Sequence, residues 1–189
     1  MSEKKLNLKG AAWKPIVKFV KVTFGNEAFT RVLESVSPPC REIASETILV
    51  NNWYEMSLIE EFISTADKLL GSGDLTIARK MGQYSAEFGI KTVYKVFMKV
   101  GTPEFVIKRA PVIWNRYYSK GKLEALVLEK GHVVLRLTDI GSISKVTCVR
   151  VTGWMEMTLK MSGAINSVVQ HISCQSRGGS FEEWEGRWE

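Results

Sequence analysis

The chain has 189 residues, of which 45% are hydrophobic and 10% aromatic, enough for one well-packed core and too apolar for intrinsic disorder. Its 26 basic and 20 acidic side chains give a formal net charge of +6, and the basic residues concentrate in residues 1–31 and 91–122. No apolar run approaches the roughly 18 residues that span a bilayer, and the polar N-terminus lacks the apolar core of a signal peptide.

Residues 11–24 have the apolar spacing of a helix, with lysines on the opposite face. Pro15 is compatible with this helix only in its first turn, so we expect the helix to begin near residue 12. Gly25 should end it, and a second helix should follow to about residue 36. The sequence Ser37-Pro38-Pro39 should then break the chain.

The middle of the chain predicts two further helices after an extended segment at residues 46–54. Ser57 and Glu60 have the spacing of a capping box, and the helix that they begin should end at Gly71. Asp74 can cap a long helix that runs toward Val100. A change of phase in its apolar stripe predicts a kink or break near Gly89.

The C-terminal half changes from helical spacing to alternation. Thr102-Pro103 has the pattern of a helix start, and Pro111 should bend that helix. Residues 123–129 and 132–138 alternate about a Lys130-Gly131 turn, which predicts a hairpin. Residues 148–161 return to helical spacing, and residues 164–189 predict a second hairpin that turns at 177–180. In its last strand Glu182 and Trp184 should share one face.

This order of elements predicts an α+β fold. A helical layer should pack on one face of a four-stranded antiparallel sheet, which is built from two hairpins that flank a helix. We find no internal repeat and no low-complexity linker, so we expect a single domain over residues 1–189.

The last hairpin, AINSVVQHISCQSRGGSFEEWEGRWE, combines a cysteine, a short Arg/Gly turn and an acidic-aromatic strand that ends in Arg-Trp. It resembles the C-terminal hairpin of the 4-vinyl-reductase and heme–NO-binding-like domains, a superfamily that also holds the small TRAPP transport subunits. The segments NNWYEMSLIEEF and GWMEMTLKMSGA and the tract of residues 83–114 resemble a bacterial, myxobacterial-type paralogous family of this superfamily.

The resemblance implies a TRAPP-subunit-like fold and frequent dimerisation. It also implies, for some members, an apolar ligand cavity, and a role in ligand sensing or scaffolding in place of catalysis. One position of the last hairpin often carries a second cysteine in relatives, and here that position is Glu182. A metal or redox role for Cys174 therefore cannot be carried over from them.

The residues themselves predict no metal site. Zinc needs about four converging ligands. His171 and Cys174 lie three apart on a predicted strand, so they should project to opposite faces, and Cys40, Cys148 and His132 have no supporting spacing. With three unpaired cysteines we expect no disulfide framework and a cytoplasmic location.

Cofactor and catalytic motifs are also missing. The nitric-oxide sensors of the superfamily hold heme through a histidine, whereas both histidines of this chain fall on predicted strands. No nucleophile motif, phosphate loop or dinucleotide fingerprint occurs. We therefore expect no cofactor, no catalytic residue and no enzymatic activity.

Three lysines, Lys91, Lys95 and Lys99, fall on one face of a predicted helix. Like charges at this spacing repel by a few tenths of a kcal/mol per pair. They could bind an anionic membrane or nucleic acid, but a solvated helix face explains them as well. We favour the solvated face and expect neither nucleic acid nor membrane as a partner.

Aromatic residues suggest a possible pocket. Core packing or a dimer interface explains most of them, but Trp and Tyr also suit a pocket for a mostly apolar ligand. The candidates are Trp53, Tyr54, Tyr84, Phe88, Trp114 and Tyr118. The leading hypothesis is a homodimeric, non-catalytic sensory or scaffolding domain that binds a small apolar ligand between helices and sheet. The alternatives are a ligand-free structural module of a dimeric assembly and a peripheral binder of anionic surfaces.

Overall fold

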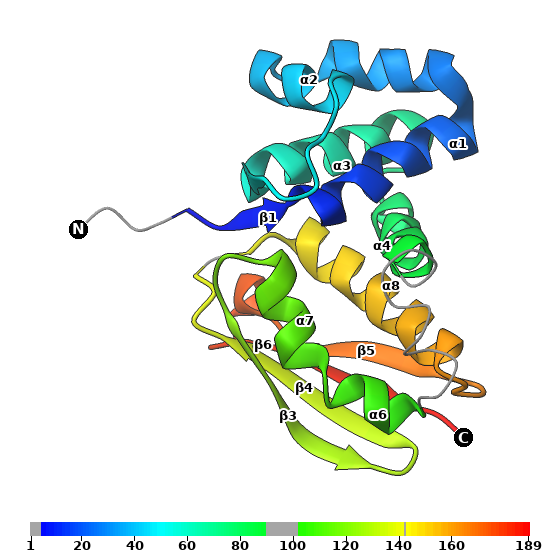
Figure 1. Cartoon of the computed structure of the whole chain (residues 1–189), viewed down its shortest axis with the longest axis vertical. Coiled ribbons are helices and arrows are strands. Elements are labelled where there is room, and N and C mark those ends of the chain that lie inside the picture. The colour runs from blue at the N-terminus through cyan, green and yellow to red at the C-terminus, as the bar shows by residue number, and fades with distance from the viewer. Residues whose placement is uncertain (1–4, 90–101, 142) are drawn as a thin grey trace.

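The helices α1, α2 and α3 and the main sheet occupy opposite ends of the molecule. A computed structural model of the chain describes residues 5–89, 102–141 and 143–189. Figure 1 shows α1, α2 and α3 at one end, the four-stranded sheet at the other, and α8 between α4 and the sheet. The N-terminal helices are α1 (Gly10–Ser35), α2 (Pro38–Ser45), α3 (Met56–Leu70) and α4 (Thr76–Gly89).

The main sheet has four antiparallel strands in the order β3-β4-β6-β5. The α+β fold and the two hairpins predicted from the sequence are thereby confirmed. A second sheet of two strands, β1 (Asn7–Lys9) and β2 (Trp53–Glu55), was not predicted. The main strands are β3 (Lys122–Glu129), β4 (His132–Thr138), β5 (Val168–Ser173) and β6 (Glu182–Arg187).

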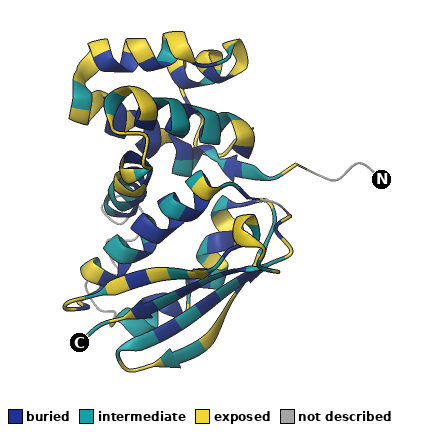
Figure 2. Cartoon of the chain, turned by 180° about the vertical axis from the view of Figure 1, so that it is seen from behind, coloured by how far each residue is buried: buried dark blue, intermediate teal, exposed yellow. Residues whose placement is uncertain are grey.

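One face of the main sheet is covered by α6 (Pro103–Ile107), α7 (Ala110–Tyr117) and α8 (Lys145–Met161). Figure 2 shows buried and more exposed residues alternating along the strands. Leu135 of β4 and Trp184 of β6 point into the buried layer, whereas Val168 and Ile172 of the edge strand β5 are exposed. This alternation is the pattern that the sequence predicted for the last strand.

The first helix begins earlier than predicted, at Gly10. The amide of Gly10 donates to the carbonyl of Asn52 over 2.9 Å, and that of Ala11 donates to Val50 over 3.0 Å. These bonds satisfy donors of the first turn from a distant loop, so Pro15 lies in the second turn. The predicted interruption at Gly25 is confirmed, since its φ of +84° is not helical.

Residues 38–45 are a helix where we expected only a break. The helix α2 has prolines in its first turn, where the missing amide proton costs nothing because no intrahelical acceptor precedes it. A Pro-Pro sequence therefore starts an element here in addition to ending the one before it.

The predicted capping box at the start of α3 is wrong. Ser57 lies inside the helix, which begins at Met56 without a side-chain cap. The carboxylate of Glu60 instead accepts from the amide of Ser144, over 3.4 Å, and from the hydroxyl of Thr147. Glu60 thus ties α3 to the first turn of α8, which lies more than 80 residues further along the chain.

Helices α4 and α8 cross with their backbones in direct contact. A Cβ atom added to Gly82 would lie 2.0 Å from the carbonyl oxygen of Arg150, and one added to Gly153 would lie 2.1 Å from that of Arg79. Asp74 accepts from the amide of Thr76 over 2.9 Å, so it helps to begin α4 as predicted. The predicted continuation of this helix beyond residue 89 lies outside the described residues.

Replacing Gly82 with alanine should separate the two helices. Because the added methyl group would overlap the backbone of α8, we expect a loss of about 1–3 kcal/mol or more in unfolding free energy, although alanine favours helix. Chemical denaturation of Gly82→Ala measures this loss. Lys80→Ala, on the exposed face of the same helix, should change stability by no more than about 0.5 kcal/mol. Equal stabilities of the two variants would contradict the packing described here.

Candidate functional site

A cavity opens between the helical layer and the buried face of the sheet. Together with the open solvent at its mouth, the space amounts to about 790 Å³. Residues of six elements meet in its wall, and most of their side chains are apolar. The described lining comes from α1 (Ala11, Ala12, Pro15), α4 (Ser85, Ala86, Gly89), α7 (Ala110, Ile113, Trp114, Tyr117), the residue after α7 (Tyr118), the sheet (Leu123, Leu135) and α8 (Arg150, Val151, Trp154, Met155).

Small residues create the open space in this wall. On α1 and α4 the residues that line the cavity are small, three alanines with a proline, a serine and a glycine, and they reach only a short distance from their helices. The direct contact of α4 with α8 holds these two helices close together beside this space. The wall is largely apolar with a few polar groups, which is the usual character of a small-molecule pocket.

Trp114 and Tyr118 form one side of the cavity as a stacked pair. Their rings are parallel to within 4°, with centroids 3.8 Å apart. The indole nitrogen of Trp114 donates to the carbonyl of Lys120 over 2.9 Å. The hydroxyl of Tyr118 accepts a hydrogen bond from the guanidinium of Arg150, which is also in the wall.

A second, smaller cavity, of about 440 Å³ when open solvent is included, adjoins the first on the side of the sheet. The two share part of their walls, including Ile113, Trp154 and Met155. The second cavity is lined almost wholly by apolar side chains of α6, α7, α8 and the sheet, among them Trp184. An elongated apolar molecule could therefore extend from one cavity toward the other.

Of the six aromatic residues predicted to line a pocket, the structure brings Trp114 and Tyr118 together in the described wall. Trp53 is 44% exposed, and the ammonium group of Lys9 lies over its ring, 4.8 Å from the centroid. Tyr54 packs edge-on against Trp13 and accepts from the amide of Leu49 over 3.0 Å. Tyr84 and Phe88 stack on each other on α4 with centroids 6.4 Å apart. These four do not belong to the described wall of the cavity.

Several residues of the wall were not anticipated. Arg150 stands between two valines, Val149 and Val151, in the sequence of α8. A charged residue within such a run is a signal that sequence analysis could have used, because arginine is almost never fully buried without a partner. The alanines of α1 and α4 gave no such signal, since alanine occurs on any helix face.

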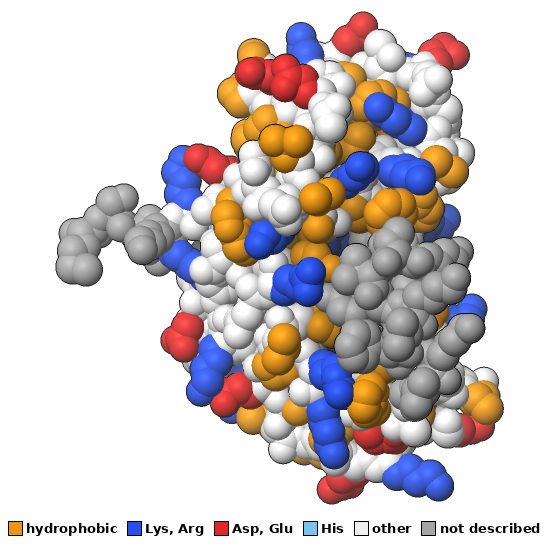
Figure 3. Space-filling view, viewed as in Figure 1, with side chains coloured by type: hydrophobic (Ala, Val, Ile, Leu, Met, Phe, Trp, Pro, Cys, Tyr) orange, Lys and Arg blue, Asp and Glu red, His pale blue; other side chains and the backbone are white. Residues whose placement is uncertain are grey.

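The predicted basic face made by Lys91, Lys95 and Lys99 lies outside the described residues. On α1, Lys18 lies over the ring of Phe88 and Lys21 over that of Phe29, at 5.0 and 4.2 Å from the ring centroids. Figure 3 shows Lys and Arg side chains scattered among hydrophobic ones over the described part of one face. No helix of the described residues is both long enough and apolar enough to cross a membrane.

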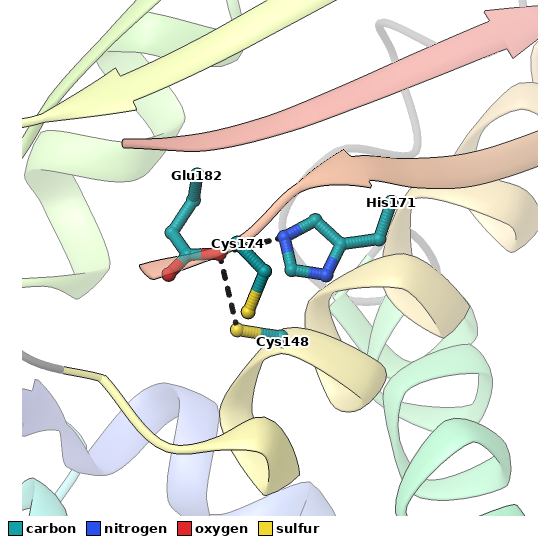
Figure 4. A group of neighbouring side chains, drawn as sticks. All are labelled: Cys148, His171, Cys174 and Glu182. Carbon is teal, nitrogen blue, oxygen red and sulfur yellow. Dashed lines mark hydrogen bonds and ion pairs between the residues drawn. The ribbon is translucent and has the colours of Figure 1, made fainter. Parts of the chain in front are cut away.

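A second group of side chains lies between α8 and the C-terminal hairpin. Cys148 of α8, His171 of β5, Cys174 and Glu182 of β6 place their ligand atoms within 4.8 Å of one another. Figure 4 shows the four side chains converging from the helix and the two strands. Cys148, Cys174 and Glu182 are buried, and His171 is partly buried.

A β-bulge brings His171 and Cys174 to the same side. The pairing of β5 with β6 shifts between His171 and Ser173, so two residues of β5 oppose Glu183. One extra residue reverses the alternation beyond it. The prediction that His171 and Cys174 project to opposite faces is therefore wrong, because it assumed an unbroken strand. Glu182, predicted on the same strand face as Trp184 and buried in the structure, was a signal for this cluster.

Hydrogen bonds connect the four residues. His171 Nε2 lies 2.6 Å from Glu182 Oε2, and the Cys148 thiol donates to the same oxygen over 3.5 Å. The other oxygen of Glu182 accepts from the amide of Gln175 over 3.0 Å. The ring of His171 also stacks on Trp184 with centroids 4.7 Å apart, which fixes its orientation.

Burial controls protonation in the cluster. Burial, followed by the Glu182 charge, raises the pKa of the Cys148 thiol well above its usual range. Burial lowers the pKa of His171, although the Glu182 carboxylate acts in the opposite direction. Both shifts favour the neutral forms: a neutral imidazole can bind a metal ion directly, whereas the Cys148 thiol must first lose its proton.

Two thiols, an imidazole and a carboxylate are a donor set that suits zinc. Ligand atoms bound to one tetrahedral zinc at about 2.0–2.3 Å lie roughly 3.3–3.8 Å apart, so small movements of these side chains would be enough. The expectation of no metal site rested on the lack of convergence, and among the described residues that convergence is present.

We expect the cluster to bind about one zinc ion per chain. Elemental analysis after zinc loading and gel filtration should find it, and zinc should raise the thermal unfolding midpoint because it binds only the assembled site. Cys148→Ser, Cys174→Ser and His171→Gln should each lose the metal.

Cys40 provides the matched control for this experiment. It is a buried cysteine whose thiol donates to the carbonyl of Leu58, outside the cluster, and its pKa is raised to about 12 by burial and by the Glu61 charge. Cys40→Ser should retain zinc. Zinc well below stoichiometry in the wild-type protein, with no effect of added zinc on unfolding, would contradict the assignment.

Several solved structures similar to this chain are H-NOX proteins. A crystal structure of an H-NOX protein from S. oneidensis in the Fe(II)NO ligation state matches with a TM-score of 0.73 and 13% identity, covering 96% of this chain and 99% of that one. The Fe(II) unliganded H-NOX protein from K. algicida matches with a TM-score of 0.71 and 8% identity, covering 96% and 97%. No protein-family model and no curated protein matches the sequence.

At identities this low, the structural similarity shows a shared fold. It does not transfer a ligand or an activity from one protein to the other. The match nevertheless extends over nearly the full length of both chains. It agrees with the resemblance to heme–NO-binding-like domains found in the last hairpin. The chain therefore has the fold of the H-NOX proteins.

Proposed function

We propose that the chain is a non-catalytic sensory or scaffolding module that binds a small, mostly apolar ligand in the cavity between its helices and its sheet. The observation that supports this most directly is the cavity itself, which is enclosed by α1, α4, α7, α8 and the sheet. A ligand there would touch elements from both ends of the molecule. Its binding would favour one arrangement of these helices over others and so alter a surface that a signalling partner contacts.

Heme does not fit this cavity through a histidine ligand. The solved structures of this fold include heme-bound H-NOX proteins, and heme iron is held in proteins by His, Cys, Met or Tyr. The chain has two histidines. His132 lies 2.9 Å from Glu185 on the sheet, and His171 belongs to the donor cluster. Neither is in the described cavity wall, so we propose a ligand other than a histidine-ligated heme.

The cavity wall gives a direct test of ligand binding. Trp114 is part of the wall, whereas Trp13 is fully buried in the core and away from both cavities. Trp13→Ala should therefore cost about 3–5 kcal/mol of unfolding free energy, and Trp114→Ala should cost clearly less, because the ring already borders open space. Denaturation of both variants measures the difference.

Fluorescence on the same protein tests occupancy. Titration with 1-octanol, an apolar probe, should shift tryptophan emission, and the shift should shrink in Trp114→Phe. Native mass spectrometry of freshly purified protein should in addition reveal any retained small molecule. A core-sized loss in Trp114→Ala together with no response to octanol would reject the ligand-binding role and favour a ligand-free structural module.

We further propose that the module is a cytoplasmic homodimer. The resemblance to families that pair through helices supports this, as does the exposure of large apolar side chains such as Val22 on α1 and Leu69 on α3, which are 64% and 37% exposed. A symmetric pair would use the same surface twice. Light scattering over a wide concentration range should give the dimer mass at micromolar protein. A monomer mass throughout that range would exclude the dimer.

A further inference from the structure

The charged side chain in the cavity wall has no counterion among the described residues. Arg150 is 3% exposed, and one of its terminal nitrogens donates to the hydroxyl of Tyr118. Its Nε atom is buried without a hydrogen-bond partner. The ion pairs of the described residues do not include Arg150. Arginine remains protonated in proteins, and a buried charge without an opposite charge is costly.

The polar atoms near Arg150 are arranged as donors. The hydroxyl of Tyr118 accepts from Arg150, so its own proton is available to a further acceptor. The hydroxyl of Ser85 is already used, since it donates to the carbonyl of Met81 over 2.7 Å. Arg150 and Tyr118 therefore offer N–H and O–H groups to whatever occupies this end of the cavity. Such a site suits an anion or another strong acceptor.

The space beyond Arg150 suits an apolar chain. Trp154 and Met155 follow it by about one helical turn and form part of the wall of both cavities. The second cavity then continues among apolar side chains toward Trp184. Methionine adapts readily to different shapes, so Met155 could adjust to a chain that passes it.

We propose that the cavity binds an amphipathic monocarboxylate. Its carboxylate is held by the guanidinium of Arg150 and the hydroxyl of Tyr118, and its apolar body extends past Trp154 and Met155 into the second cavity. The inference rests on the proposed ligand-binding function and specifies the class of ligand. A carboxylate has two oxygens that match the fork of an arginine, whereas a phosphate carries more charge and more oxygens than these two groups can satisfy.

Octanoate and 1-octanol separate the charged head from the apolar tail. The two probes have the same chain length and differ in the terminal group. Calorimetric titration of the full chain at neutral pH should show octanoate binding at least about tenfold more tightly than octanol. Octanoate should also raise the thermal unfolding midpoint more than octanol does at equal concentration.

Variants of the two donor residues identify the cause of that preference. Arg150→Met keeps the length of the side chain and removes the charge, so it should abolish the preference for octanoate and leave octanol binding equal or stronger. Tyr118→Phe should weaken octanoate binding several-fold with little effect on octanol. Arg116→Met, which removes an exposed arginine of α7 outside the cavity wall, should behave as the wild type.

The outcomes distinguish this inference from the function on which it rests. If the wild type binds neither probe, the proposed ligand-binding function fails and the monocarboxylate fails with it. If octanol binds as tightly as octanoate, the cavity holds apolar ligands and the proposed carboxylate site is rejected. The proposed site is also rejected if Arg150→Met and Tyr118→Phe both still bind octanoate more tightly than octanol. Should Arg150→Met not fold, as judged by circular dichroism, Tyr118→Phe alone decides between these results.

Discussion

The direct contact between the backbones of α4 and α8 is the constraint on which the rest of this structure depends. It exists because Gly82 and Gly153 carry no side chain at the crossing, so each helix meets the carbonyl oxygen of the other. Helices kept apart by ordinary side chains pack at about 8–10 Å between axes. The closer approach holds α8 between the N-terminal helices and the sheet, where it is buried on several sides.

The position of α8 determines both candidate sites. On one side Cys148 reaches the hairpin cluster, and Thr152 accepts from the indole of Trp184 over 3.0 Å. On another side Arg150 and Trp154 reach the cavity. Because the two sites lie on one rigid helix, a displacement of α8 by a ligand in the cavity would also move Cys148 relative to Glu182. The sensory role proposed above would then have a physical route to the C-terminal hairpin.

The comparison with H-NOX proteins separates fold from ligand. This chain and those proteins share an architecture over nearly their whole lengths at 8–13% identity. The fold provides a space between a helical layer and a sheet, but the side chains in that space decide what it can hold. Here the wall offers an arginine, a tyrosine and many small apolar groups, and both histidines lie elsewhere. The donor cluster is likewise set by individual residues, Cys148, His171, Cys174 and Glu182.

The sequence alone determined those features that depend on neighbours along the chain. The spacing of apolar residues located the helix that ends before Gly71, and alternation placed Glu182 and Trp184 on one strand face. These predictions succeed because the periods of helix and strand are local properties of the backbone. For the same reason the turn at Lys130-Gly131 and the break at Gly25 could be predicted, since both need a residue that tolerates positive φ.

Only the tertiary structure decided how these elements meet. Glu60 has the spacing of a local cap, yet its carboxylate binds the start of α8, because a partner brought close by folding competes with a local one. A bulge of one residue in β5 turned Cys174 toward His171, and no local pattern marks where such a residue will be accommodated. That Arg150 has a hydrogen bond to Tyr118 but no counterion among the described residues is likewise a property of its surroundings. Local periodicity tells which face of an element is buried, but not which side chains of other elements it will face there.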